Sequence, residues 1–182
     1  MITIKRLSAW KYDTSASGGV AVGIVALEGG ALYFLDPNGL SRKFRYGGLG
    51  AGLSWGLKIP KMPKIQIKGK SAGGVAAPAS FPSRGALLVT NRCPGGDLVK
   101  SDIQGACAFL DGGIGVVGGV YGGVMLLGLN TFSVLAAVSN PSLSVVLWPV
   151  ALESAQAILA FGGANLGIQA GAGAAGFIGA VV

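Results

Sequence analysis

The sequence contains no histidine, and it has only two cysteines in 182 residues. The absence of histidine excludes Ser-His-Asp and Cys-His catalysis, and it removes the commonest general base and a common metal ligand. Two thiols are too few for a cysteine metal cage, so Cys93 and Cys107 are expected to be unpaired thiols in a reduced compartment, although one disulfide could form after export. The sequence therefore predicts no enzyme, no cofactor and no metal site.

Charge is almost absent from the second half of the chain. All 14 Lys and Arg residues lie at or before Lys100, and Glu153 is the only charged residue among the 71 from Gly112 to the end. A water-soluble domain needs charge on its outer face, so this run is expected to be buried in protein, in a partner or in lipid, and we favour lipid. We therefore divide the chain into a basic β-rich domain at 1–104 and a glycine-rich, apolar, membrane-active region at 105–182.

The amino terminus lacks the apolar segment that a secretory signal peptide requires. We therefore expect a protein that is cytoplasmic before any export. Three carboxylates, Asp97, Asp102 and Asp111, could in principle form a catalytic pair. Solvation or turn formation explains Asp97 and Asp102 equally well, because both lie in a polar loop.

The first part of the chain carries the alternation and the turn signals of antiparallel strands. Strands are predicted at 19–27, 31–35, 40–46 and 85–90. Turns are predicted at 28–30 and at 36–39, where Asp-Pro-Asn-Gly has proline and glycine at the positions that a type I turn prefers. The fold class is therefore expected to be α+β and mainly β, with an amino-terminal antiparallel sheet that is a sandwich or barrel-like, followed by a region able to form membrane helices.

A basic arm follows these strands at 58–70, with five lysines and two prolines in 13 residues. The prolines exclude a helix interior, so the arm is expected to be extended. The lysines that we expect to contact an anionic lipid surface are Lys58, Lys61, Lys64, Lys68 and Lys70. Alternatively, the arm is solvated and only keeps an apolar protein in solution. Nucleic-acid binding, with Trp55 stacking on a base, would leave the apolar half unexplained, so no nucleic-acid partner is expected.

Glycines recur every four residues in two uncharged segments of the second half. They are Gly115, Gly119, Gly123, Gly163, Gly167 and Gly171. On a helix this spacing allows close packing against another helix in lipid, and the 27 uncharged residues at 112–138 exceed the roughly 20 that a helical span needs. The alternative is a pair of buried strands joined by a turn at 111–113, and the two forms can be alternative states of one sequence. A further helix is predicted at 151–160, after Pro149.

A basic, glycine-rich chain without a signal peptide and with these two glycine stripes resembles the pore-forming antibacterial effectors of bacterial type VI secretion. The resemblance covers residues 105–182 and rests on the glycine spacing. It implies secretion into a competitor cell, insertion into that cell's inner membrane, and ion leakage through a pore formed by self-assembly. It also implies a cognate immunity protein and a secretion-tube carrier protein as partners. The alternative is a soluble β-rich binding or structural module whose apolar half is core.

Overall fold

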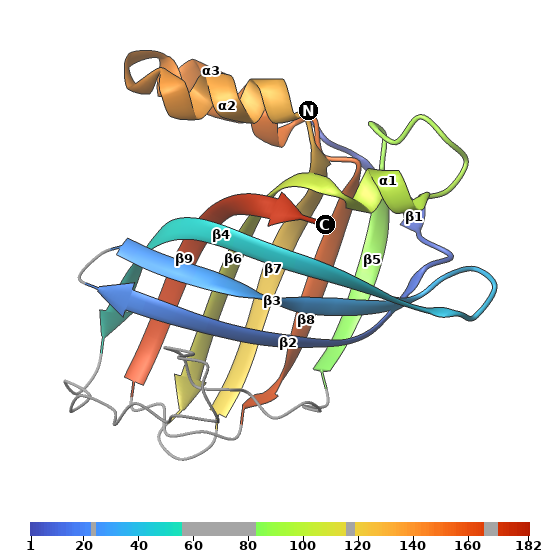
Figure 1. The fold of residues 1–182 in the computed structure, drawn as a ribbon, viewed down its shortest axis with the longest axis horizontal. Coiled ribbons are helices and arrows are strands. Elements are labelled where there is room, and N and C mark those ends of the chain that lie inside the picture. The colour runs from blue at the N-terminus through green and yellow to red at the C-terminus, as the bar shows by residue number, and fades with distance from the viewer. Residues whose placement is uncertain (23–24, 56–82, 116–118, 166–170) are drawn as a thin grey trace, which may run out of the picture.

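The computed structural model describes residues 1–22, 25–55, 83–115, 119–165 and 171–182. These residues form an antiparallel sheet of nine strands, in the order β1-β5-β8-β7-β6-β9-β4-β3-β2, and the sheet curls on itself. Figure 1 shows β2, β3 and β4 crossing in front of the other strands. The expectation of a mainly β fold with an antiparallel sheet is therefore confirmed.

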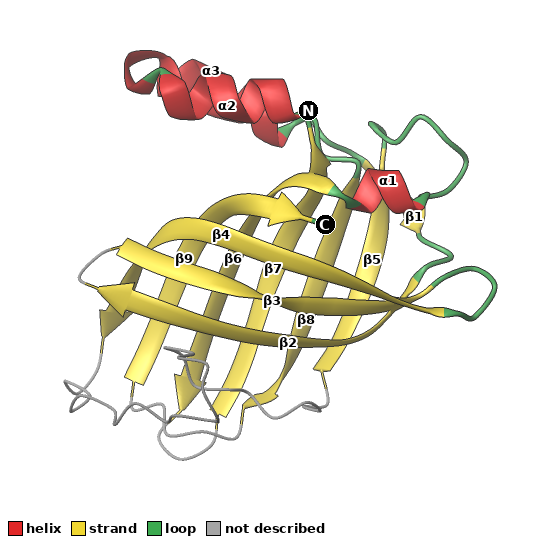
Figure 2. Ribbon diagram, in the orientation of Figure 1, coloured by secondary structure: helices red, strands yellow, loops and turns green. Residues whose placement is uncertain are grey.

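The strands are β1 (Ile4–Leu7), β2 (Lys11–Val22), β3 (Val25–Leu35), β4 (Ser41–Trp55), β5 (Ser83–Thr90), β6 (Gly105–Gly115), β7 (Gly119–Leu129), β8 (Ala157–Asn165) and β9 (Gly171–Val181). The helices are α1 (Lys100–Ile103), α2 (Thr131–Ser139), the 3-10 turn η1 (Pro141–Leu143) and α3 (Ser144–Leu152). Figure 2 shows α2 and α3 side by side beyond one end of the sheet.

The curl brings the last strand of the sheet, β2, close to strands at its other end. The ring of Tyr12 in β2 lies 6.4 Å from the ring of Phe161 in β8. A Cβ atom on Gly85 in β5 would approach the Tyr12 ring to 2.6 Å, so glycine is needed where these strands meet. The amide of Ser8 also donates a hydrogen bond to the carbonyl of Leu87 at 2.8 Å, which ties the segment before β2 to β5.

The core lies inside the curl, and the apolar half of the chain supplies much of it. Residues paired in register across adjacent strands form one buried row: Leu87, Leu159, Met125, Phe109 and Phe177. The rings of Phe109 and Phe177 stack at 4.7 Å. Aromatic side chains of β3 and β4 complete the core, and Phe34 meets Phe44 edge to face at 5.7 Å. Burial of such side chains is the main stabilising contribution to folding.

The structure has strands where the sequence interpretation favoured membrane helices, because β6 and β7 cover the described residues of 112–129 and β8 and β9 those of 157–181. The strand period explains this outcome. Phe109, Met125 and Phe177 alternate with outward residues, while each glycine would cost about 1 kcal/mol relative to alanine in a water-exposed helix. The hairpin alternative was thus nearer, although β6 continues through 111–113 without turning.

Three local predictions have different outcomes. The turn at 36–39 is confirmed, because the amide of Gly39 donates to the carbonyl of Asp36 at 2.8 Å. The turn at 28–30 is wrong, because β3 runs straight through these residues and pairs with β4 along its length. The helix at 151–160 is also wrong, since α3 ends at Leu152 and β8 begins at Ala157.

Both halves of the chain contribute strands to this sheet. β4 from the first half pairs with β9, and β5 pairs with β8. The division at residue 104 into a basic and a membrane-active region stays a prediction about function.

Candidate functional site

The structure brings together most of the glycines that the sequence singled out. Gly115 of β6 pairs with Gly119 of β7 on one side and with Gly171 of β9 on the other. Gly123 and Gly163 lie further along β7 and β8 in the same part of the sheet. Gly167 lies outside the described residues.

These five glycines share the face of the sheet that bears the core. Each lies an even number of residues from Phe109, Met125, Leu159 or Phe177, and successive residues of a strand point to opposite faces. Beyond the stacked Phe109 and Phe177 rings, the inner face is thus lined largely by glycine backbone. The helical spacing of four residues becomes, in strands, a shared orientation.

The outer face of the same strands is apolar and open. From β6 to β9 its described residues are alanine, glycine, valine, leucine and isoleucine, and none of them carries a charge. Leu110 of β6 is 65% exposed and Val120 of β7 is 69% exposed. Leu49 of the neighbouring β4 continues this surface, whereas Arg45 and Lys43 appear on the outer face further along β4. Large exposed apolar patches mark interaction surfaces.

A helical hairpin covers one end of this outer face. Val134 and Ala137 of α2 and Ala151 of α3 belong to a small second core with Ala106 and Ala108 of β6. Among the described residues, no single helix has the length and hydropathy needed to cross a bilayer, and α2 together with Pro141–Leu152, bent by 108°, meets that test as a broken pair.

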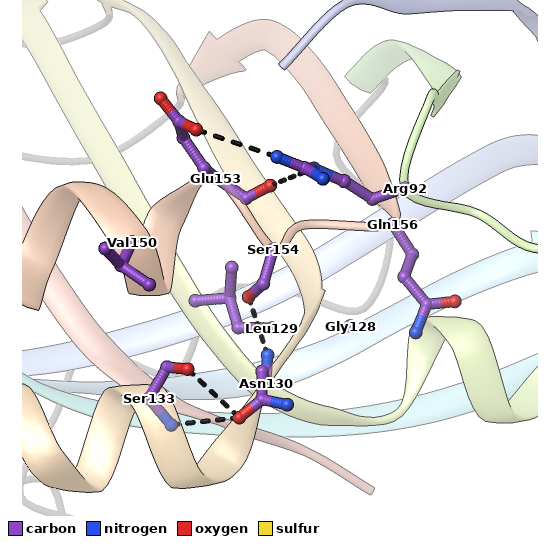
Figure 3. A pocket seen from close by; sticks show the side chains of 9 residues that line it. All are labelled: Arg92, Gly128, Leu129, Asn130, Ser133, Val150, Glu153, Ser154 and Gln156. Carbon is purple, nitrogen blue, oxygen red and sulfur yellow. Dashed lines mark hydrogen bonds and ion pairs between the residues drawn. The ribbon is translucent and has the colours of Figure 1, made fainter. Parts of the chain in front are cut away.

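A shallow polar hollow of about 440 Å³ lies where the hairpin joins the sheet (Figure 3). Ser154 accepts a hydrogen bond from the amide of Asn130 at 2.8 Å, and the Nε of Arg92 donates to the carbonyl of Glu153 at 3.0 Å. The Oε1 of Gln156 is buried without a hydrogen-bond partner among the described residues. This hollow pairs no nucleophile with a general base, so its hydrogen bonds serve to fix the hairpin on the sheet.

Glu153 closes the uncharged run and is held as an ion. The amino group of Met1 donates to its Oε2 at 2.7 Å, and Arg92 lies 3.7 Å away. The hydrogen bond and charge of that amine, together with Arg92, lower the pKa of Glu153. The base of the hairpin is thereby marked by a cluster of fixed charges.

The three candidate carboxylates hold separate structural positions. Asp97 accepts hydrogen bonds from the hydroxyl of Ser8 and the amides of Ala9 and Leu98, and Asp102 accepts one from the amide of Val99 at the start of α1. Asp111 lies within β6, two residues from Phe109 and therefore on the inner face. Among the described residues, no group of three or more His, Cys, Asp or Glu side chains could hold a metal ion.

The two cysteines are free and buried, so the prediction of unpaired thiols is confirmed. Burial raises the pKa of Cys107 to about 12, against a weaker effect of its hydrogen bond with Gly179. Trp55 is the last residue of β4. The five lysines expected to contact lipid lie outside the described residues.

Sequence reasoning missed the helical hairpin. Its signals were present: Asn130 is a good N-cap residue, and Pro141 interrupts the helix that follows. In the structure the side chain of Asn130 accepts a hydrogen bond from the amide of Ser133 at 2.9 Å, and α2 ends two residues before Pro141. These signals were outweighed by attention to the glycine spacing on either side.

Comparison with known proteins gives a single informative relative. No family model matches the chain, and no solved structure matches it. The chain is 37% identical over 183 aligned residues to "Toxin protein Tse4" of Pseudomonas aeruginosa, with 96% of this chain and 93% of the relative covered. It belongs to the Tse4 toxin family. The similarity to Tse4 extends through the basic half as well as the apolar half, and the relative's name agrees with the expectation of a toxin.

Proposed function

We propose that this member of the Tse4 family is a membrane-inserting toxin, delivered by type VI secretion, that forms ion-permeable pores in the inner membrane of a target bacterium. The observation that carries the proposal is the outer face of β6 to β9, which is apolar, exposed and free of charge among the described residues. Such a surface is unfavourable in water and matches the hydrocarbon of a bilayer.

The glycine-lined inner face supports a second step. In the sheet, Gly115, Gly119 and Gly171 are hidden from the outer surface. We propose that this sheet is the form carried before insertion. In lipid the two uncharged segments repack as helices along the six glycines of the sequence pattern, because close helix packing replaces the absent hydrophobic effect there.

The expected partners follow from this reading. A protein that exposes so much apolar surface needs a carrier during export, and a secretion-tube protein would supply one. A producing cell would need a cognate immunity protein. The lysine arm at 58–70 would hold the toxin on an anionic membrane, and no enzymatic step is part of the proposal.

A soluble β-rich binding or structural module is the second candidate. The inner residues of the apolar half favour it, because Phe109, Met125 and Phe177 are ordinary core side chains with at most 5% exposure. This candidate accounts for the inner face and leaves the exposed Leu110 and Val120 unexplained. It predicts no effect of the protein on a membrane.

The proposal is tested by directing the protein to either side of a bacterial inner membrane. Expression in a bacterial host with an added export signal should collapse the membrane potential, read with a potential-sensitive dye, within minutes of induction. The same chain kept in the cytoplasm, at equal abundance, should act more weakly, because we propose entry from the periplasmic side. A stable membrane potential in cells that accumulate the folded exported protein would contradict the proposal.

A further inference from the structure

The helical hairpin presents an apolar surface of its own, opposite the side that packs on the sheet. We call it the hairpin face, and its members are Phe132, Leu135, Val138, Leu143, Val145, Val146 and Val150. Phe132 and Val145 are each 85% exposed, which is unusual for large apolar side chains in water. The 22 residues from Thr131 to Leu152 include no charged residue.

We propose that the hairpin face is the part of the toxin that first enters lipid, docking into one leaflet of the bilayer before the strands rearrange. This inference rests on the proposed function and names the element that begins it. The glycine segments and the lysine arm are separate from the hairpin face in the sequence.

The hairpin satisfies its own polar groups, which is the condition for leaving water. At the start of α2, Asn130 caps the amide of Ser133 at 2.9 Å. At the tip, the side-chain amide of Asn140 donates to the carbonyl of Ala136 at 2.8 Å, and the amide of Leu143 donates to the carbonyl of Asn140 at 3.0 Å. At the end of α3, Ser154 donates to the carbonyl of Ala151.

The same features favour lipid over a protein partner. A protein interface of ordinary composition surrounds its apolar centre with polar groups and forms about one hydrogen bond per 100–200 Å². The polar side chains at the ends of the hairpin already hydrogen-bond within it or to Ser154 at its base, and the hairpin face offers no charge for a partner to recognise. Hydrocarbon requires neither hydrogen bonds nor charge.

The size of the hairpin sets how far it can enter. α2 and α3 each have nine residues. At about 1.5 Å per residue, each is roughly 14 Å long, about half of a hydrocarbon core of some 30 Å. The hairpin therefore suits a single leaflet, and the charges of Arg92 and Glu153 at its base would remain among the lipid headgroups.

The first experiment places an environment-sensitive fluorophore on the hairpin face. Val145→Cys is labelled in the folded protein, where Cys93 and Cys107 are buried. The matched control is Leu40→Cys, at an exposed position in the turn after β3. On mixing with vesicles of phosphatidylglycerol and phosphatidylethanolamine, the probe at position 145 should shift to the blue and be quenched by lipids with a spin label in the acyl chain, whereas the probe at 40 should change little.

The second experiment measures binding. Phe132→Glu with Val145→Glu changes two positions that are almost fully exposed, so folding should be preserved. Vesicle cosedimentation should weaken by at least about tenfold, because a carboxylate is costly in the bilayer. Leu40→Glu, the matched control, should bind like the unmodified protein. Unchanged binding of the double variant, or an unshifted probe at 145 on vesicles that leak, would overturn the inference while the proposed function stands.

Two further outcomes separate the alternatives. If the unmodified protein neither binds nor permeabilises these vesicles, the proposed function fails and the inference fails with it. If Phe132→Glu with Val145→Glu converts a dimer in lipid-free solution to a monomer and vesicle binding is unchanged, the hairpin face joins two copies of the chain, and the lipid inference is overturned.

Discussion

Replacing Gly179 by alanine should destabilise the seam between β4 and β9, where the first half of the chain meets the last strand. Gly179 pairs with Gly48 in a ladder that runs from Tyr46 and Val181 to Trp55 and Ala172. A Cβ atom at Gly179 would overlap the carbonyl oxygen of Gly47 and would lie 2.6 Å from the Cα of Gly48. All the obstructing atoms are backbone, so no side chain can rotate away and the strands must separate.

The expected cost follows from that geometry. Overpacking by one methyl group typically costs about 1–3 kcal/mol, and rigid backbone on the opposite strand places Gly179→Ala toward the upper end. For a chain of this size this loss corresponds to a fall in melting temperature of roughly 2–12 °C. Thermal unfolding followed by circular dichroism, with urea unfolding as a second measurement, gives the free-energy difference directly.

Gly47→Ala is the matched control, one strand away from Gly179. A Cβ atom there would lie 3.8 Å from the carbonyl oxygen of Glu28, an ordinary contact. Alanine also reduces the freedom of the unfolded chain, so Gly47→Ala should be neutral or stabilise by up to about 1 kcal/mol. Equal stability of the two variants would refute the reasoning, because it would mean that β4 and β9 do not approach as closely as the structure shows.

Three further predictions concern single groups and the lysine arm. Burial opposes ionisation of Asp97, but hydrogen bonds from Ala9, Leu98 and Ser8, with the charge of Arg6, hold its pKa below the usual 3.8; the stability lost in Asp97→Asn should therefore be present at neutral pH and disappear as pH falls below about 4 through the folded-state pKa, in urea unfolding at each pH. The buried Cys93 and Cys107 should react with a thiol reagent only after denaturation, and rapid reaction of the native protein would show that the core is open. Changing three lysines of the arm to glutamine should weaken binding to anionic vesicles by roughly two orders of magnitude at low salt and leave neutral vesicles unaffected, whereas an arm that only confers solubility would leave binding unchanged and cause aggregation. The variant carries Lys58→Gln, Lys61→Gln and Lys64→Gln.

The parts of the fold that could be predicted from sequence are those with local signals. The turn at 36–39 follows from Pro37 and Gly39, and Gly39 has the positive φ of 78° that glycine permits. The strand 85–90 follows from its short apolar run. The strand pairing was out of reach, because β5 pairs with β8 over a separation of more than 70 residues, and nothing in either segment specifies that partner.

The glycine-rich half shows why a short apolar run is ambiguous. A spacing of four residues places Gly115, Gly119 and Gly123 on one helix face, and it also places them on one face of strands, because four is a multiple of both periods to a good approximation. The deciding information was the alternation of Phe109, Leu110 and Asp111, with the first buried, the second exposed and the third again inward. The hairpin needed a different signal, the cap at Asn130, which acts over only three residues.

The central claim is that the folded protein opens a membrane to ions. Purified protein should release a small trapped dye from vesicles of phosphatidylglycerol and phosphatidylethanolamine at nanomolar to micromolar concentration, while a trapped dextran of several kilodaltons stays inside. Gly119→Leu, which would hold paired glycine stripes apart, should lose dye release and keep the far-ultraviolet dichroism of the folded protein. No dye release by the unmodified protein would contradict the account, and full release by Gly119→Leu would contradict the role given to the glycines.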